Sequence, residues 1–397
     1  MDALEYHRMN NGKMEIKSKV PFENKEDLSL AYTPGVAMPC KEIFKDRKKV
    51  YEYTFKGNSV AVVTDGSAVL GLGNLGAEGA LPVMEGKALL FKKFGNIDAI
   101  PICLRTQDSN EIINIVENIS PTFGGINLED ISAPRCFEIE NELKNRLNIP
   151  IMHDDQHGTA IVVLAGLINA CKAVGKQFSD VKVVISGCGA AGIAVAKILL
   201  NSGVENIIML DTKGIVHNNR KDLNEFKREI AKLTIKCMHS DKNIKSKCEK
   251  CIDGSLKEAI AGSDVFIGVS APNILSVEMV RSMNDDAIIF ALSNPDPEIL
   301  PGDAKKGGAK VIATGRSDYP NQINNALAFP GVFRGALDAN ATMINEEMKI
   351  AAANALANFV KKPSIERIIP NIFEEGVARA VSIAVKEAAI KTGAARK

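Results

Sequence analysis

Two pairs of adjacent carboxylates stand where two predicted strands end. The segment NLEDIS contains Glu129 and Asp130, and the segment MHDDQHGT contains Asp154 and Asp155. Because the carboxyl ends of parallel strands meet at one edge of a sheet, we expect these acids to lie together. Clustered carboxylates repel one another unless a cation lies between them, and oxygen ligands favour Mg²⁺ or Mn²⁺. On spacing alone, a helix N-cap role for Asp130 and Asp155 is an equal alternative.

Cysteine and histidine offer a second kind of metal site. The lysine-rich segment 236–252 has the pattern C-x-H-x₈-C-x₂-C, formed by Cys237, His239, Cys248 and Cys251. Four such ligands could hold a structural zinc, but the spacing fits no common zinc finger, so free thiols in a solvated loop are favoured. A zinc role is also open to His153 and His157, for which capping or hydrogen bonding is favoured.

Two segments fit the pattern G-x-G-x-x-G, and the second, GCGAAG, has the context of a dinucleotide-binding loop. It follows a predicted strand directly and opens a predicted helix. Gly187 permits the tight turn, Gly189 lets the backbone approach a pyrophosphate, and Gly192 lets the helix pack on the strand. We expect the whole loop to contact the cofactor: Gly187, Cys188, Gly189, Ala190, Ala191 and Gly192.

The strand after this loop ends at Asp211, where an acid is expected to bind the adenosine ribose hydroxyls. A carboxylate there repels a 2′-phosphate, which favours NAD, although the nearby Lys213 weakens that preference and keeps NADP as an alternative. The first glycine motif, GLGNLG, lies six residues after its strand, and the next strand ends without an acid. We interpret this motif as a flexible loop that leads into the helix carrying Lys87.

The elements that would position these groups alternate between strand and helix, which is typical of parallel sheets flanked by helices. The first run of predicted strands covers 59–64, 98–104, 124–127 and 149–153. A long helix near 156–174 separates it from a second run at 181–186, 206–211, 264–270, 287–293 and 310–315. The fold class is therefore α/β, with the main boundary near residues 155–160.

Composition excludes several function classes. Hydrophobic residues make up 46% of the 397 residues, charged residues 24%, and the net charge is +1. This balance gives no electrostatic reason to expect nucleic acid or an anionic membrane as a partner. The N-terminal segment lacks the apolar core of a secretory signal, and the apolar run 159–171 is too short to span a bilayer. Eight scattered cysteines indicate reduced thiols and a cytoplasmic protein.

Six segments in series resemble the malic enzyme family, most closely its short, bacterial-type branch. They are AYTPGVA, MEGKALLFK, NLEDI, HDDQHGTA, ALSNPDPE and NQINNALAFPGVFRGALD, and the likeness extends in order from about residue 20 to about 390. The family oxidises L-malate to oxaloacetate with NAD or NADP and decarboxylates it to pyruvate. The resemblance implies an N-terminal substrate and metal domain, 1–157, and a doubly wound Rossmann-type NAD(P)-binding domain, 158–397. Helices from about residue 338 would pack back on the first domain or on a partner.

The resemblance also implies roles for individual residues. Tyr32 would be the acid that protonates C3 of enolpyruvate, and Lys87 the base that takes the C2 hydroxyl proton, which requires a lowered pKa. Asp154 would support the metal ligands or take part in catalysis. The metal ligands would be Glu129, Asp130 and Asp155, and Asn294 and Asn325 would lie near malate and the nicotinamide. Without the motif, Lys87 would be interpreted as a surface residue and Tyr32 as an ordinary turn residue.

One departure concerns the substrate carboxylate. Longer relatives carry an arginine for it where this chain has Ala68, and Arg105 is a candidate replacement. The family forms dimers or larger homo-oligomers. Alternative functions are a metal-independent amino-acid dehydrogenase, a malate dehydrogenase or malolactic activity at the same site, and a non-catalytic NAD- or zinc-sensing module.

Overall fold

A computed structural model describes residues 2–234 and 254–396, and it contains two separate sheets. The first sheet has the strand order β2-β1-β3-β4, and all of its pairs are parallel. Its strands are β1 Ser59–Thr64, β2 Asp98–Cys103, β3 Gly125–Leu128 and β4 Ile151–His153. The helices of this half are α1 Ala3–Asn10, α2 Lys25–Ala31, α3 Ala37–Lys45, α4 Val50–Tyr53, α5 Gly76–Gly95, α6 Ser109–Ile119 and α7 Arg135–Arg146.

The second sheet has the order β10-β9-β8-β5-β6-β7 and is parallel except for the short edge strand β7. Its strands are β5 Lys182–Ser186, β6 Asn206–Asp211, β7 Gly214–Ile215, β8 Val265–Gly268, β9 Ile288–Ala291 and β10 Val311–Thr314. Its helices are α9 Ala190–Asn201, α10 Glu225–Thr234, α11 Leu256–Ile260, α12 Val277–Arg281 and α13 Pro301–Lys306. The chain order reverses beside β5, as in doubly wound folds.

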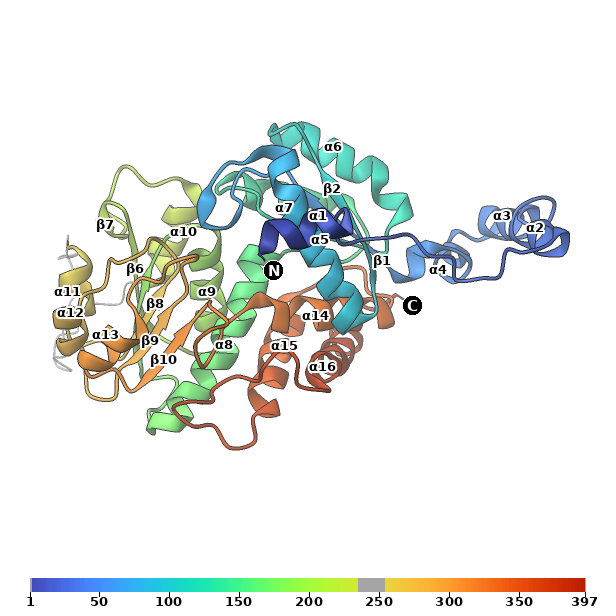
Figure 1. Ribbon diagram of the computed structural model, residues 1–397. Helices are drawn as coiled ribbons and strands as arrows, with labels where there is room; N and C mark the ends of the chain where they lie inside the picture. Colours follow the sequence, from blue (N-terminus) through green and yellow to red (C-terminus); the bar gives the residue numbers. More distant parts are fainter. Residues whose placement is uncertain (1, 235–253, 397) are drawn as a thin grey trace.

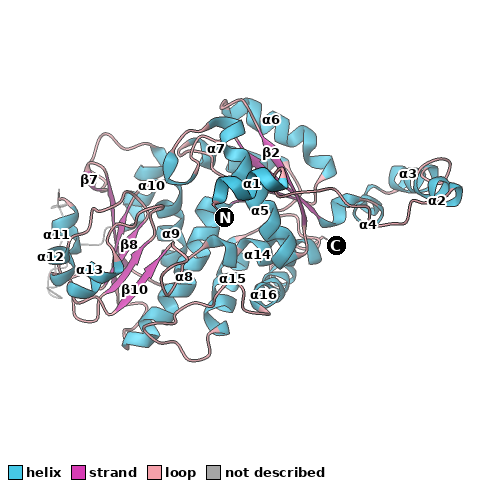
Figure 2. Cartoon of the chain, viewed as in Figure 1, coloured by secondary structure: helices cyan, strands magenta, loops and turns pink. Residues whose placement is uncertain are grey.

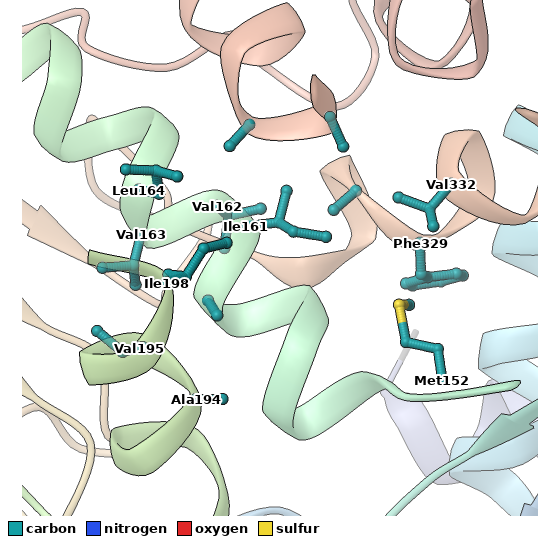
Figure 3. Packing of buried hydrophobic residues seen from close by; sticks show 14 of the residues in the cluster. Met152, Ile161, Val162, Val163, Leu164, Ala194, Val195, Ile198, Phe329 and Val332 are labelled. Carbon is teal, nitrogen blue, oxygen red and sulfur yellow. The ribbon is translucent and has the colours of Figure 1, made fainter. Parts of the chain in front are cut away.

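The helix α8, Asp154–Val174, joins the two halves and forms part of their shared core. It lies between the two sheets (Figure 1). In Figure 3 its apolar side chains, including Val163, point towards Val195 and Ile198 of α9. By length and composition α8 could cross a membrane, but 67% of its apolar window is buried inside the protein. It is therefore a core helix.

The C-terminal helices lie against the first half of the chain. They are α14 Phe329–Asp338, α15 Glu346–Phe359 and α16 Val377–Lys391. Phe91 of α5 stacks on Phe329 and Phe333 of α14, with ring centroids 4.7 and 5.4 Å apart. This aromatic contact fixes the helix that carries Lys87 to the last third of the chain.

An arm formed by α2 and α3 projects away from the body (Figure 1). Neither helix has a buried residue. The exposed apolar side chains of the arm include Leu28 and Leu30 on α2, Met38 and Phe44 on α3, and Val36 just before α3. An isolated arm with this much exposed apolar surface is typical of a segment that packs on another molecule.

The α/β fold class predicted from the sequence is confirmed, and most element bounds agree within two residues. The helix α5 begins at Gly76, the last residue of the first glycine motif, so this motif leads directly into the helix that carries Lys87, as expected. Figure 2 shows the alternation of helices and strands through both halves.

Candidate active site

Two pairs of acids meet at the carboxyl edge of the first sheet. Glu129 and Asp130 directly follow β3, while Asp154 and Asp155 begin α8 directly after β4. Because β3 and β4 pair in parallel, both pairs lie at the same edge. One carboxylate oxygen from each of Glu129, Asp130 and Asp155 lies within 4.8 Å of the others.

Local hydrogen bonds hold these acids in place. Asp130 has a left-handed backbone, with φ of 53°, and its N–H donates to Oδ2 of Asp155 over 2.8 Å. The side-chain amide of Asn127 donates to Oε2 of Glu129 over 2.9 Å. The N-cap residues of α7 and α8 are Pro134 and His153, so the helix-cap interpretation of Asp130 and Asp155 is wrong.

Lys87 extends from α5 into this cluster. Its Nζ lies 2.6 Å from Oδ2 of Asp154 and 2.8 Å from Oε1 of Glu129. The same amine lies 4.4 Å from the ring centroid of Phe329, and the side chain is 7% exposed. The interpretation of Lys87 as a surface residue is therefore wrong.

The pKa of Lys87 does not follow the expectation that it is lowered. Burial acts to lower the pKa, but Asp154, Glu129 and Asp155 outweigh burial and raise it above its ordinary value. In this arrangement Lys87 is an ammonium. The negative charge around it must be reduced before the amine can lose its proton and act as a base.

Negative charge exceeds positive charge at this edge of the sheet. Burial raises the pKa of Glu129, and Asp155, Asp154 and Asp130 raise it further, against the opposing effect of Lys87. Oδ1 of Asp154 is buried without a hydrogen-bond partner among the described residues. Clustered carboxylates that share a single ammonium fit a divalent cation, which prefers such oxygen ligands.

Of the two predicted asparagines, Asn325 contacts the acidic cluster. Nδ2 of Asn325 donates to Oδ2 of Asp154 over 2.6 Å, so Asn325 and Lys87 hold the same oxygen. Asn294 follows β9 at the carboxyl edge of the second sheet. A Cβ added to Gly71 would lie 1.9 Å from the carbonyl oxygen of Asn294. The first glycine motif therefore contacts the other half of the chain at Asn294.

The second glycine motif has the geometry of a dinucleotide-binding loop. Gly187 has φ of +117° at the end of β5, and a Cβ at Gly192 would lie 1.8 Å from the Gly187 carbonyl oxygen. A Cβ at Gly189 would meet nothing within 4 Å, so open space lies beside the backbone there. Cys188 is buried, and Ala190 and Ala191 begin α9. The open space at the N-terminus of α9 suits a pyrophosphate.

Two predicted residues are exposed. Tyr32 directly follows α2 on the arm and is 65% exposed, and its backbone bonds to Leu28 and Val36 within the arm. Arg105 follows β2, is 91% exposed and pairs with Glu78 on the surface, and its role in place of the arginine missing at Ala68 stays a prediction. Within one chain, the arm that carries Tyr32 projects away from α5, the helix that carries Lys87 (Figure 1).

The histidines have different surroundings. Nε2 of His157 lies 3.0 Å from Oε2 of Glu140, and Nζ of Lys349 lies 3.1 Å from Nδ1. Burial lowers the pKa of His157 to about 4, so the neutral ring donates from Nε2 and accepts at Nδ1. His153 is buried, with Nε2 3.7 Å from Oδ2 of Asp155. The candidate zinc ligands Cys237, His239, Cys248 and Cys251 lie outside the described residues.

Sequence reasoning missed several residues that support these groups. Glu140 accepts the backbone N–H of His153 over 2.9 Å and the Gln156 side-chain amide over 3.2 Å, which fixes the turn that carries Asp154. Arg220 and Lys227 contact Asp211. A local signal existed only for Asn127, which stands in the same segment as Glu129.

Family models match nearly the whole chain. The model "Malic enzyme, N-terminal domain" matches residues 11–111 and 105–144, and "Malic enzyme, NAD binding domain" matches residues 156–392. The bifunctional malic/malolactic enzyme of Bacillus subtilis is 57% identical over 100% of this chain and 94% of its own length. The NAD-dependent malic enzyme of Geobacillus stearothermophilus is 56% identical over 97% of this chain and 78% of its own length.

Solved structures agree with these matches. The NAD-dependent malic enzyme of Thermotoga maritima superposes with a TM-score of 0.91 at 48% identity, covering 97% of this chain and 99% of that one. The malic enzyme of Pyrococcus horikoshii also gives 0.91, at 50% identity, covering 100% of this chain and 91% of that one.

Proposed function

The chain belongs to the malic enzyme family, and we propose that the edge carrying Lys87 and Glu129 converts malate to pyruvate and CO₂ with reduction of NAD or NADP. The observation that carries this proposal is the buried contact of the Lys87 amine with Asp154 and Glu129, beside two further carboxylates. A base, a metal-ligand cluster and a dinucleotide loop are the groups that this reaction needs.

Glu129, Asp130 and Asp155 would hold Mg²⁺ or Mn²⁺. They fit because their oxygens already converge within 4.8 Å and because their negative charge is only partly balanced. When bound, the cation acts as a Lewis acid that polarises the C2 oxygen of malate and stabilises the enolate formed on loss of CO₂.

Lys87 would accept the C2 hydroxyl proton while hydride passes from C2 to the nicotinamide. This role needs the neutral amine, and the carboxylates that now keep Lys87 protonated are those that would bind the cation. A cation bound by these carboxylates would offset part of their charge and would lower the pKa of Lys87. Asp154 Oδ2, 2.6 Å from Nζ, is the neighbour that can take the proton onward, and Asn325 orients it.

Tyr32 would complete the site from a second copy of the chain. The arm that carries the exposed Tyr32 projects away from α5, and it presents exposed apolar side chains for packing. In a symmetric dimer, each arm would cover the partner and deliver Tyr32 to the partner's site, where the phenol protonates C3 of the enolate. In this proposal, catalysis requires the homodimer predicted from the family likeness, because each active site takes its Tyr32 from the partner.

Two further expectations remain proposals. We place the domain boundary between residues 157 and 158, in the first turns of α8, so that the metal ligands precede it. We also place the protein in the cytoplasm, because the cysteines among the described residues, Cys40, Cys103, Cys136, Cys171 and Cys188, are all free thiols.

A malolactic reaction, from malate to lactate and CO₂, is the second candidate function. The relative from Bacillus subtilis carries both activities in its name. The same base, cation and cofactor would serve if the hydride returned to C2 of pyruvate before release. Membership of the malic enzyme family speaks against the amino-acid dehydrogenase and the non-catalytic sensor.

Turnover of L-malate with Mn²⁺ tests this proposal. We expect NADH or NADPH and pyruvate in equal amounts, loss of both with EDTA, and their return on adding Mn²⁺. Asp155→Asn removes a proposed ligand and should need far more Mn²⁺, while Asp303→Asn on the surface should behave like the wild type. Lactate without net NADH would favour the malolactic reaction, and turnover that survives EDTA would contradict the metal site.

A further inference from the structure

The backbone of Asp130 is held by two hydrogen bonds. Its N–H donates to Oδ2 of Asp155 over 2.8 Å, and its carbonyl oxygen accepts the N–H of Ala68 over 2.9 Å. The left-handed backbone of Asp130, with φ of 53°, is uncommon for a residue other than glycine and depends on such contacts. Ala68 belongs to the loop 65–68, which follows β1 at the same edge of the first sheet. The position of this loop therefore affects the position of a proposed metal ligand.

Ser67 is the centre of the loop 65–68. Its hydroxyl donates to Oδ1 of Asp65 over 2.5 Å, and it accepts the backbone N–H of Ser132 and Nη2 of Arg135, each over 2.9 Å. A hydroxyl offers one donor and two acceptor sites, so all of its hydrogen-bonding sites are used. Ser67 is 9% exposed and Asp65 is 1% exposed. This buried hydroxyl fixes the loop against the segment that follows Asp130.

Arg135 holds both Asp65 and Ser67. It is the first residue of α7, and its Nη1 lies 2.7 Å from Oδ2 of Asp65. The same nitrogen donates to the carbonyl oxygen of Gln107 over 2.5 Å, and Nη2 also donates to Oγ of Ser132 over 3.1 Å. A planar guanidinium has donors in fixed directions, which suits this set of acceptors better than the ammonium of a lysine does.

The loop also holds the first turn of α5. The carbonyl oxygen of Gly66 accepts the N–H of Leu75 over 3.0 Å and the N–H of Gly76 over 3.1 Å. Gly66 has φ of +65°, and a Cβ there would lie 2.1 Å from the carbonyl oxygen of Gly76. One loop therefore contacts both the segment that carries Asp130 and the helix that carries Lys87.

We propose that Arg135 and Ser67 are positioning residues that set the affinity of the carboxylate cluster for a divalent cation. They act through the backbone of the loop, which brings the N–H of Ala68 to Asp130. This inference rests on the proposed function, because it takes Asp130 to be a ligand. Side chains that hold metal ligands from behind change metal affinity by about tenfold or more. If Arg135 and Ser67 served the fold alone, their loss would lower stability and leave this affinity unchanged.

Titration of the full chain with Mn²⁺, without malate or cofactor, tests this inference. Electron paramagnetic resonance counts the free ion and gives the dissociation constant. We expect Ser67→Ala and Arg135→Gln each to raise this constant about tenfold. Arg135→Lys keeps the charge but not the paired donors, so its dissociation constant should lie between those of the wild type and Arg135→Gln.

Two exposed positions provide matched controls. Arg146→Gln removes an exposed arginine from the same helix as Arg135, and Ser282→Ala removes an exposed serine hydroxyl from the other half of the chain. Both should bind Mn²⁺ as the wild type does. If Arg135→Gln does not fold by circular dichroism, Ser67→Ala, which deletes one oxygen atom, decides the question.

Hydrogen exchange of the segment 65–76 gives a second measurement. Because one loop bonds Asp130 and the first turn of α5, Mn²⁺ should slow exchange of the Leu75 and Gly76 amides in the wild type. This protection should be smaller in Ser67→Ala, in which Asp130 is less firmly joined to the loop.

Wild-type affinity for Mn²⁺ in folded Ser67→Ala would overturn the inference, as would an equal loss of affinity in Arg146→Gln. A wild type that binds Mn²⁺ but does not turn over malate would contradict the proposed function, while the variants would still decide this inference. A wild type that binds no Mn²⁺ would overturn both.

Discussion

Lys87 and Asp154 are joined by a buried contact of 2.6 Å between Nζ and Oδ2. The amine comes from α5 and the acid from the first residue of α8, so this contact connects the helix of the first half to the helix shared by both halves. Because both side chains are buried, removing one partner leaves an unbalanced charge in a dry environment. The proposed catalytic pair is therefore also a structural pair.

Replacement of Lys87 by Met should separate these two roles. Turnover of malate should fall about 100-fold or more, because the proton acceptor is lost. Without divalent cation the free energy of unfolding should fall by about 3 kcal/mol, because Glu129 and Asp154 lose their ammonium. Mn²⁺ should raise the melting temperature of the variant more than that of the wild type.

Lys310→Met, at an exposed position, serves as the control and should change neither quantity. Thermal unfolding with and without Mn²⁺, together with initial rates, checks both effects. An active Lys87→Met enzyme would remove Lys87 from the mechanism, whatever its stability.

Glu140 lies beneath the turn that carries Asp154, and it supplies a pH-dependent test. Burial acts to raise its pKa, but His157 and Lys144 outweigh burial and lower the pKa well below its ordinary value. A group with a lowered carboxyl pKa contributes stability that is present above the unfolded-state pKa and is lost as the pH falls below it. Glu140→Gln should therefore lose about 3 kcal/mol at pH 7.

The difference between the wild type and Glu140→Gln should shrink by about 1.4 kcal/mol for each pH unit below about 4.3. Urea unfolding from pH 7 downwards, over the range in which both proteins stay folded, measures it. Glu366→Gln, at an exposed position, should show no such trend. A difference that is constant with pH would mean that the charge of Glu140 is not what stabilises the turn.

The sequence predicts the elements well because their hydrophobic periodicity is local. Strand 59–64 has the bounds that its pattern indicates, and the helix predicted to open at the second glycine motif forms as α9. Lys87 is different: nothing local distinguishes its position on α5 from a surface position, and the family likeness alone selects it. Contacts such as that of Arg220 with Asp211 depend on how separate elements pack, and no spacing rule encodes them.

The position of Tyr32 is a second feature that the sequence alone does not predict. The sequence motif around Tyr32 can be identified, but the direction of the arm depends on packing. It depends on whether the exposed apolar side chains of α2 and α3 pack against the rest of the same chain. A single sequence does not state which surface covers them. Under the proposed function, Tyr32 would therefore meet Lys87 of a second chain.

The absence of a side chain at Gly71 lets the two halves of the chain approach each other closely. A Cβ there would lie 1.9 Å from the carbonyl oxygen of Asn294, so Gly71→Ala must push the first glycine loop away from the segment after β9. We expect kcat to fall about tenfold or more, since small misplacement of reacting groups has large effects on rate. Affinity for 5′-AMP should be unchanged, because the second loop is untouched.

Gly302→Ala is the matched control, because a Cβ there meets nothing within 4 Å. Steady-state kinetics and titration of 5′-AMP check the two expectations. Wild-type kcat in Gly71→Ala would show that contact between the first loop and Asn294 is not required for turnover.

Subunit complementation tests whether Tyr32 acts in the partner's site. Tyr32→Phe and Lys87→Met should each be nearly inactive as homodimers in pyruvate formation. In a mixed dimer with shared sites, one site receives the intact Tyr32 and the intact Lys87, while the other site receives neither. Mixing the two variants one to one should therefore restore roughly a quarter of the wild-type activity, because about half of the dimers are mixed and each has one complete site.

If Tyr32 served its own chain, every site in the mixed dimer would lack one of the two groups, and mixing would restore nothing. Different affinity tags on the two variants allow the mixed dimer to be isolated and its composition checked before the assay. Tyr319→Phe, which alters a tyrosine on the other half of the chain, should be active alone and serves as the control for the substitution. An inactive mixed dimer of verified composition would confine Tyr32 to its own chain, and the arm would then have to fold back to reach Lys87.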